Sequence, residues 1–286
     1  AATAPGARHA FAVDPRQDTT SADLGVLPGG NLSVATAVND AGLIVGYAQL
    51  GDGTFRAFTA GLGPLTAVAL TNGWSEMWAT AVNAAGEVAG HARLAADGST
   101  NGFLFALGQS RNLGRPAGAA HVVVTAINAG SSVFGHALYN AGAASRVVRW
   151  DNGVWTELGD MLGGGRAEVT GANRYGQIVG RALTTDGVWH AFLYTDGRAY
   201  DLNELLATDT DWTLGAAAAI NDRAQIAVTG TRAGGPPQAL LLFPATEIGR
   251  RVCRPEGTLA ELPRITILPG SGNVGDANNS FFWSAV

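Results

Sequence analysis

Short apolar runs separated by turn residues fill the chain, and the same order of runs returns several times. In the first complete copy these runs are residues 36–39, 43–49, 56–60 and 65–70. Runs of this length with alternating apolar and polar positions are typical of strands that have one buried face. The pattern therefore predicts four antiparallel strands in each copy, which we call strands a, b, c and d.

A segment of nine or ten residues marks the copies. AVNDAGLIVG at residues 37–46 returns as AVNAAGEVAG at 81–90, AINAGSSVFG at 126–135, ANRYGQIVG at 172–180 and AINDRAQIAV at 219–228. The asparagines of these segments are 44, 45, 45 and 48 residues apart, at Asn39, Asn83, Asn128, Asn173 and Asn221. A fixed period of about 40 to 50 residues indicates a propeller or a solenoid.

The residues between the runs suit tight turns. Asn39 to Gly42 connects strand a to strand b, and Asn and Asp side chains bond to the backbone of such turns while Gly adopts positive φ. Asn152-Gly153 and Asp196-Gly197 connect strand c to strand d, as two-residue hairpins require. Four antiparallel strands per repeat predict one blade of a β-propeller, with a solenoid of β-arches as the alternative.

The two ends of the chain predict how a propeller would close. Residues 9–13 match strand c and residues 23–25 match strand d, so the chain starts in the middle of a blade. In the tail, residues 259–262 would be strand d, and residues 264–268 and 280–286 would be the strands a and b that complete the N-terminal half-blade. This gives six blades without a free sheet edge, with five or seven as alternatives. The expectation is one all-β domain, 1–286, with repeats at about 9–36, 37–80, 81–125, 126–171, 172–218 and 219–262 and closing strands at 263–286.

Composition supports a folded core and excludes some partners. Hydrophobic residues make up 47% and charged residues 14%, which provides apolar area for a core. The net charge is −5, and all 18 basic residues are arginine without a basic block, so we expect no nucleic-acid partner. No run of 18 apolar residues occurs, so we expect no membrane span. Separately, we expect the protein to be a monomer. Cys253 is the single cysteine, and we interpret it as having no chemical role.

The repeated motifs resemble those of a known family. His9-Ala10-Phe11, then Asp23-Leu24-Gly25, then the Asn-Asp-Ala-Gly segment are similar to the HAF-family repeats of bacterial extracellular proteins. The similarity covers residues 8 to about 243. It implies a secreted or periplasmic protein with β-propeller-like repeats. The start at Ala1 fits a mature chain whose signal peptide has been removed, although a cytosolic protein would begin in the same way. It implies nothing about activity.

One predicted face of the repeats carries long, variable loops. The d-to-a connections, such as residues 73–78 and 163–168, and the b-to-c connections hold the candidate ligand-binding residues. Loops of this kind commonly carry function. Tryptophan rings beside carboxylates suit sugars, although the same rings could simply pack between blades. The candidates are Trp74, Glu76, Trp78, His121, Trp189, Asp209, Asp211 and Trp212.

A second candidate set follows the strand-b glycine. The residues there are Tyr47, His91, His136 and Arg181, with Thr229 one step out of phase. Such residues have the chemistry for β-elimination on a uronate: arginine neutralises the carboxylate, and His or Tyr moves the protons. The set also resembles, in residue types only, the sites of propeller-fold polysaccharide lyases. The histidines could instead hold a metal with His121, or lie hydrogen-bonded between sheets.

The remaining motifs are weaker. Asp209 and Asp211 have the spacing of a cation loop without its Gly and distal Glu, so calcium is one option for a cofactor. The glycine run at 163–165 lacks the context of a phosphate loop. The sequence favours an exported propeller that recognises a glycan. A lyase for acidic polysaccharides and a protein-binding scaffold are the alternatives, so catalysis stays open.

Overall fold

The computed structural model describes residues 6–13, 21–71, 73–139, 142–206, 211–244 and 265–269. Antiparallel sheets dominate, and no α-helix occurs among these residues. In the same ranges, no helix is therefore long and apolar enough to cross a membrane. The all-β class with antiparallel strands is confirmed.

The described residues divide into two compact units. The first unit holds the residues up to Val133 together with Trp150–Val154, and the second holds Phe134–Arg149 and the residues from Trp155 to Pro269.

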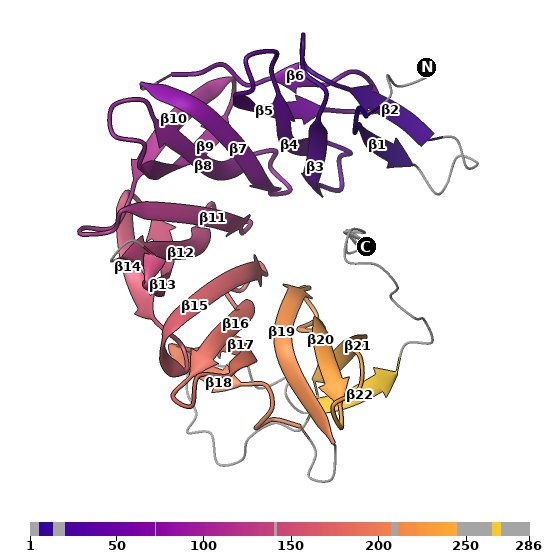
Figure 1. Cartoon of the computed structure of the whole chain (residues 1–286), viewed down its shortest axis with the longest axis vertical. Coiled ribbons are helices and arrows are strands. Elements are labelled where there is room, and N and C mark those ends of the chain that lie inside the picture. The colour runs from indigo at the N-terminus through magenta and orange to yellow at the C-terminus, as the bar shows by residue number, and fades with distance from the viewer. Residues whose placement is uncertain are drawn as a thin grey trace. The chain divides into compact units, whose positions relative to one another are not determined.

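In the first unit, a hairpin precedes two four-stranded groups (Figure 1). The hairpin pairs β1 (Ala10–Val13) with β2 (Ser21–Gly25). The first sheet contains β3 (Ser33–Val38), β4 (Ile44–Gln49), β5 (Phe55–Ala60) and β6 (Thr66–Ala67). The second sheet contains β7 (Trp74–Val82), β8 (Val88–Leu94), β9 (Thr100–Ala106) and β10 (Gln109–Gly114), and β11 (His121–Ile127) meets β9 at one parallel bridge.

The second unit continues the pattern. β12 (Val133–Tyr139), β13 (Ala144–Asp151) and β14 (Val154–Gly159), most of whose residues belong to this unit, are neighbours in that order and make up the third group of strands. The fourth sheet contains β15 (Gly163–Ala172), β16 (Ile178–Thr184), β17 (Trp189–Thr195) and β18 (Arg198–Asp201). The last sheet contains β19 (Trp212–Ile220), β20 (Ile226–Arg232), β21 (Gln238–Pro244) and β22 (Ile265–Pro269). Both four-stranded sheets lie with their strands side by side in Figure 1.

Two strand assignments from the sequence are wrong. Strand a starts earlier than expected, so segments predicted as loops, such as residues 73–78 and 163–168, lie largely in β7 and β15. The fourth strand of the last sheet is β22, which pairs with β21, although residues 264–268 were expected among the closing strands. Residues 259–262 and 280–286, which completed that scheme, lie outside the described residues. Strands b and c and the hairpin of strands c and d in β1 and β2 match the prediction.

A bulge recurs in strand a. The register shifts between Ala35 and Ala37, and again between Val169 and Gly171, so Thr36 and Thr170 are the extra residues. Each hydroxyl donates to a carbonyl of the next sheet: Thr36 to Ala79 O at 2.9 Å and Thr170 to Ala217 O at 2.8 Å. The bulge thus links neighbouring sheets.

The repeated asparagine makes a second link of this kind. In the first sheet, Asn39 Oδ1 accepts from the backbone N–H groups of Ala41 and Leu43, which closes the a-to-b turn. Its Nδ2 donates to the carbonyl of Asn83, the equivalent residue of the second sheet, at 2.9 Å. Asn83 donates in turn to Asn128 O at 3.1 Å, and in the second unit Asn173 donates to Asn221 O at 3.1 Å.

The strand-b glycine makes room for a phenylalanine of strand c. A Cβ on Gly180 would stand 2.0 Å from Glu168 O and 2.9 Å from the ring of Phe192, its partner in the register. In the last sheet the equivalent pair is Val228 and Leu240. A larger residue on strand b is thus accompanied by a smaller one on strand c.

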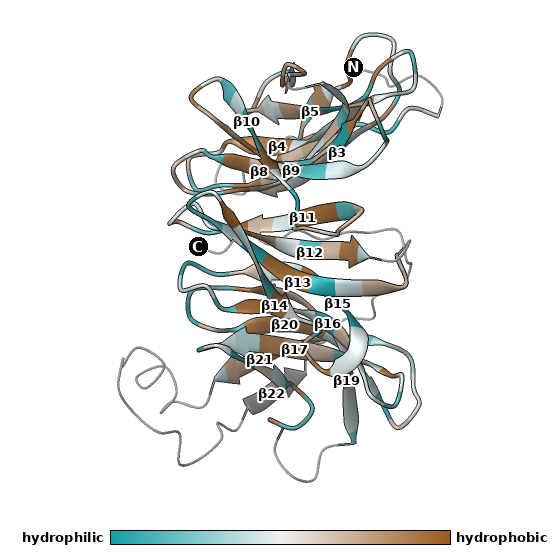
Figure 2. Ribbon diagram, turned by 90° about the vertical axis from the view of Figure 1, so that its left-hand side faces the viewer, coloured by the Kyte–Doolittle hydropathy of each residue, from teal (hydrophilic) through white to brown (hydrophobic). Residues whose placement is uncertain are grey.

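The core lies between successive sheets of each unit. Val45 and Ala57 of the first sheet pack with Met77 and Val88 of the second. In the second unit, Val179 of the fourth sheet packs with Leu214 and Val228 of the last sheet. Figure 2 shows apolar residues concentrated on the strands and hydrophilic residues in many turns.

Asn173→Asp tests the link between sheets. Asn173 is only 4% exposed, and the aspartate keeps the acceptor for the turn but loses the Nδ2 donor to Asn221 O. We expect the free energy of unfolding to fall by about 3 kcal/mol, because a buried carbonyl loses its partner and a charge is buried. Urea denaturation measures the change. Asn152→Asp, in the exposed turn between β13 and β14, is the control, and an equal loss there would contradict the account.

Candidate ligand-binding site

The residue after the strand-b glycine has the same place in each register. Tyr47 pairs with Val34 and Ala57, and Arg181 pairs with Glu168 and Ala191. Thr229 pairs with Ala216 and Ala239. Thr229 is therefore in phase with the others, and the expected shift of one step is wrong.

In the first unit this position lies in an aromatic cluster. The ring of Tyr47 meets Phe55 edge-on at 5.7 Å, Phe55 lies 6.0 Å from Trp78, and Trp78 stacks on His91 at 5.5 Å. All four side chains are partly buried. Four rings from the first and second sheets thus pack together where these sheets meet.

The other candidates of the first unit support this cluster or the core. Glu76 Oε1 accepts from Phe55 N at 3.4 Å, and its other oxygen lies 3.4 Å from Arg93 Nη1. Trp74 is 5% exposed and belongs to the core between the two sheets. His121 begins β11, opposite Thr100.

His136 in the second unit lies near charged groups of the fourth sheet. Burial lowers the pKa of His136 to about 4; Glu168 acts in the opposite direction, while Arg181 and Arg166 lower the pKa further. Its Nδ1 is buried without a hydrogen-bond partner among the described residues. The imidazole is therefore neutral at neutral pH.

Arg181, Glu168 and Trp189 form one connected group. Arg181 donates from Nε and Nη2 to Glu168 Oε2, at 2.9 and 2.7 Å. The guanidinium carbon lies 4.7 Å from the centre of the Trp189 ring, and that of Arg166 lies 5.6 Å from it. Hydrogen bonds to a carboxylate and stacking on a ring both fix the direction of a guanidinium. Arg181 is thus held in one orientation on an exposed surface.

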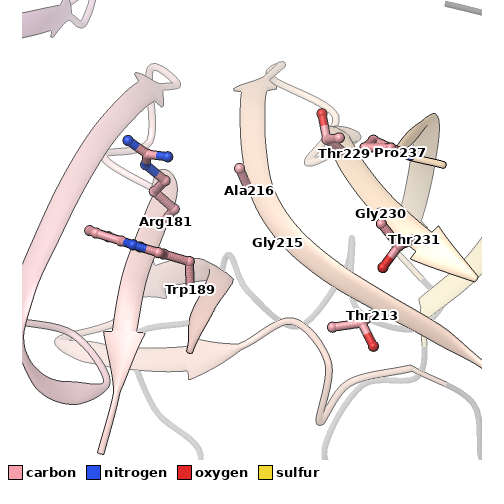
Figure 3. Close-up of a pocket in the computed structure, with 9 residues that line it drawn as sticks. All are labelled: Arg181, Trp189, Thr213, Gly215, Ala216, Thr229, Gly230, Thr231 and Pro237. Carbon is pink, nitrogen blue, oxygen red and sulfur yellow. The ribbon is translucent and has the colours of Figure 1, made fainter. Parts of the chain in front are cut away.

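A pocket of about 360 Å³ opens beside this group, between the fourth and last sheets. We call it the Trp189 pocket. Figure 3 shows Arg181 and Trp189 on one side and the residues of the last sheet on the other. The full lining is Arg181, Trp189, Thr213, Gly215, Ala216, Thr229, Gly230, Thr231 and Pro237.

Small residues keep this pocket open. Ala216 pairs with Thr229 as Trp78 pairs with His91, so both pairs hold the same place in their sheets. Trp189 and Phe55 also hold equivalent places. Each lies on strand c, two residues before the register partner of the strand-b residue, which is Arg181 in the fourth sheet and Tyr47 in the first. In the first unit, two rings fill the space that Ala216 and Thr229 leave open in the second.

Two carboxylates were predicted just before β19. Asp211 has a partner, and Asp209 lies outside the described residues. Asp211 pairs with Arg232 Nε at 2.7 Å, and this hydrogen bond holds the pKa of Asp211 below its usual value. Trp212 packs on the core of the last sheet. Asp209 and Cys253 lie outside the described residues, so the calcium prediction rests on Asp211 alone. In the part of the chain that the structure describes, no group of three or more His, Cys, Asp or Glu residues could hold a metal.

The residues that carry the family resemblance have structural partners. His9 Nδ1 lies 2.9 Å from Asp23, and His190 Nδ1 lies 2.6 Å from Asp201. The aspartates also accept from backbone N–H groups two residues ahead, those of Gly25 and Asn203. This part of the motif joins strand c to strand d and caps the turn that follows.

Comparisons with known proteins do not assign a family. No family model matches the chain, and no curated protein matches it. Among solved structures, a mutant of the Aleuria aurantia lectin in complex with α-methyl-L-fucoside is 14% identical, with 85% of this chain and 79% of that chain covered, at a TM-score of 0.42. A likeness this weak supports no conclusion about fold or function.

Sequence reasoning found Arg181 and Trp189 but missed their neighbours. Glu168, Arg166, Thr213 and Thr231 were not among the candidates, and Thr229 was named only as a position out of phase. Glu168 was recognisable only as a carboxylate in a strand-a position where other repeats have Val34, Trp78 or Ala216. The sequence pattern predicts a loop at this position, so Glu168 was not compared with the strand-a residues of the other repeats.

The buried His136 makes stability depend on pH. An unfolded histidine titrates near its ordinary pKa of about 6.5, whereas the native pKa of His136 is about 4. Between these values the unfolded chain binds more protons, so the free energy of unfolding falls as the pH decreases. We expect His136→Gln to remove roughly 1 to 3 kcal/mol of this fall, as measured by urea denaturation at successive pH values.

At about pH 8 the imidazole is neutral in both the folded and the unfolded state. A difference in the free energy of unfolding between His136→Gln and the unchanged protein at this pH therefore reports packing and not titration. Parallel curves for His136→Gln and the unchanged protein down to about pH 4 would contradict a depressed pKa for His136.

Proposed function

We propose that the protein is an exported carbohydrate-binding protein whose ligand occupies the Trp189 pocket. The observation that carries the proposal is an open pocket with an indole at its wall and a guanidinium fixed beside it. An apolar ring packs against the C–H groups of a sugar, while a few placed polar groups bond its hydroxyls.

The chemistry of the lining suits a sugar. Arg181 supplies N–H donors, and Thr213, Thr229 and Thr231 supply hydroxyls that both donate and accept. A volume of about 360 Å³ falls in the usual range of small-molecule sites. Thr213 and Thr229 are exposed, so a ligand can reach them from solvent.

Binding is favoured over elimination by the lining itself. A lyase needs a side chain that takes the proton, and the residues of the Trp189 pocket include neither His nor Tyr. His136, the candidate base of the second unit, is mostly covered and does not line this pocket. In the first unit, the rings of Trp78 and His91 fill the equivalent space.

For the whole chain we propose six propeller blades. The five asparagine segments and the β1–β2 hairpin support this number, because the hairpin supplies strands c and d of a further blade. Since β22 completes the last sheet, closure depends on residues 270–286, which lie outside the described residues.

Two variants test the pocket in opposite ways. Trp189→Ala removes the apolar wall, and Ala216→Trp fills the space as Trp78 does in the second sheet. Against a panel of soluble neutral and acidic oligosaccharides, we expect each variant to weaken binding by about tenfold or more, as measured by titration calorimetry.

Trp155→Ala, on β14, is the matched control and should bind as the unchanged protein does. Ala216→Trp should keep its thermal midpoint, because the equivalent place accommodates an indole. Undiminished binding by both pocket variants, or no binding to any member of the panel, would refute the proposed function.

A further inference from the structure

The charges around Trp189 do not cancel. Arg166 and Arg181 both lie over or beside its ring, at 5.6 and 4.7 Å from the centre. Glu168 is the carboxylate that faces both, with oxygens 3.9 Å from Arg166 Nη2 and 2.7 Å from Arg181 Nη2. His136 is neutral at neutral pH, so the group carries one surplus positive charge within a chain of net charge −5.

The two arginines are not equivalent. Arg181 is bonded twice to one oxygen of Glu168, through Nε and Nη2, and it lines the pocket. The hydrogen bonds of Arg181 to Glu168 run from Nε and Nη2, which leaves Nη1 to donate to a ligand. Arg166 lies beyond hydrogen-bond distance of Glu168, and its Nε is buried without a partner in the described part of the chain.

Among the residues that line the pocket, none carries a negative charge that would compensate this surplus. At the β19–β20 end of the last sheet, Asp211 and Arg232 form a pair of their own at 2.7 Å. The remaining lining residues are uncharged. An anionic group that enters beside Trp189 would thus meet a net cation on a partly covered surface, where such an interaction is screened less than in open solvent.

From this arrangement we infer that the ligand is an acidic sugar, whose carboxylate accepts a hydrogen bond from Arg181 beside the Trp189 ring. The inference rests on the proposed function and names its ligand class. Glu168 is a positioning residue that orients Arg181. Arg166 balances the negative charge of Glu168, so that Arg181 retains its attraction for the ligand's carboxylate.

Trigalacturonate and its methyl ester test the inference directly, since they differ in charge but hardly in shape. We expect the acid to bind about tenfold more tightly than the ester in calorimetry. Raising the salt from about 50 to about 500 mM should weaken binding of the acid and leave the ester unaffected, because screening acts on the charged ligand alone.

Arg166→Gln should reduce the ratio of the two affinities several-fold, because it removes the surplus positive charge that attracts only the acid. Arg198→Gln, which removes an exposed arginine of β18 in the same unit, is the matched control and should leave the ratio as it is. Glu168→Gln should weaken both ligands through the loss of Arg181 orientation, and a circular-dichroism spectrum shows whether the fold is retained.

The outcomes separate the two claims. Equal binding of the acid and the ester overturns the acidic class while carbohydrate binding stands, and so does an unchanged ratio in Arg166→Gln. Tighter binding of a sulfated disaccharide than of trigalacturonate overturns the assignment to a carboxylate. Binding of none of these sugars, and of none in the wider panel, overturns the proposed function itself.

Discussion

The repeats depend on an asparagine amide that acts in two directions. Asn39 closes its own turn through Oδ1 and bonds the next sheet through Nδ2. A carboxylate could do only the first, because it has no N–H group to donate. Because the donor and acceptor of one side chain are both used, the turn and the spacing between sheets are fixed together. The threonine in the bulge of strand a adds a parallel contact, from Thr170 to Ala217 O in the second unit.

Where the backbone is held in this way, residues at nearby positions can change without loss of the fold. The strand-b glycine and its phenylalanine become Val228 and Leu240, and the position after the glycine becomes aromatic, cationic or small. The same geometry therefore produces a filled aromatic cluster around Trp78 and an open pocket beside Ala216. The sizes of one strand-a residue and its strand-b partner distinguish the two, since these pairs hold equivalent places in the register.

The sequence was a good guide wherever the physical cause is local. Turn residues and apolar runs located β4, β5, β16 and β17 and the asparagine turns, because both signals lie within a few residues of the chain. The start of β7 was missed because Gly73 and Ser75 look like a loop, and what extends the strand is its pairing with β8. The Arg181–Glu168 pair was missed for the same reason: its two residues are neighbours across strands, not along the chain. The pocket exists because the side chain of Ala216 is small. A search of the sequence for reactive residues does not find such a position.

The central claim is that the repeated backbone leaves a ligand site open beside Trp189. Its most direct test is a crystal structure of the protein soaked with trigalacturonate. The account predicts electron density for the sugar against Trp189, a carboxylate oxygen within hydrogen-bond distance of Arg181, and an unchanged aromatic cluster from Tyr47 to His91. Sugar bound between the rings of that cluster, or bound beside Trp189 with its carboxylate directed away from Arg181, would contradict it.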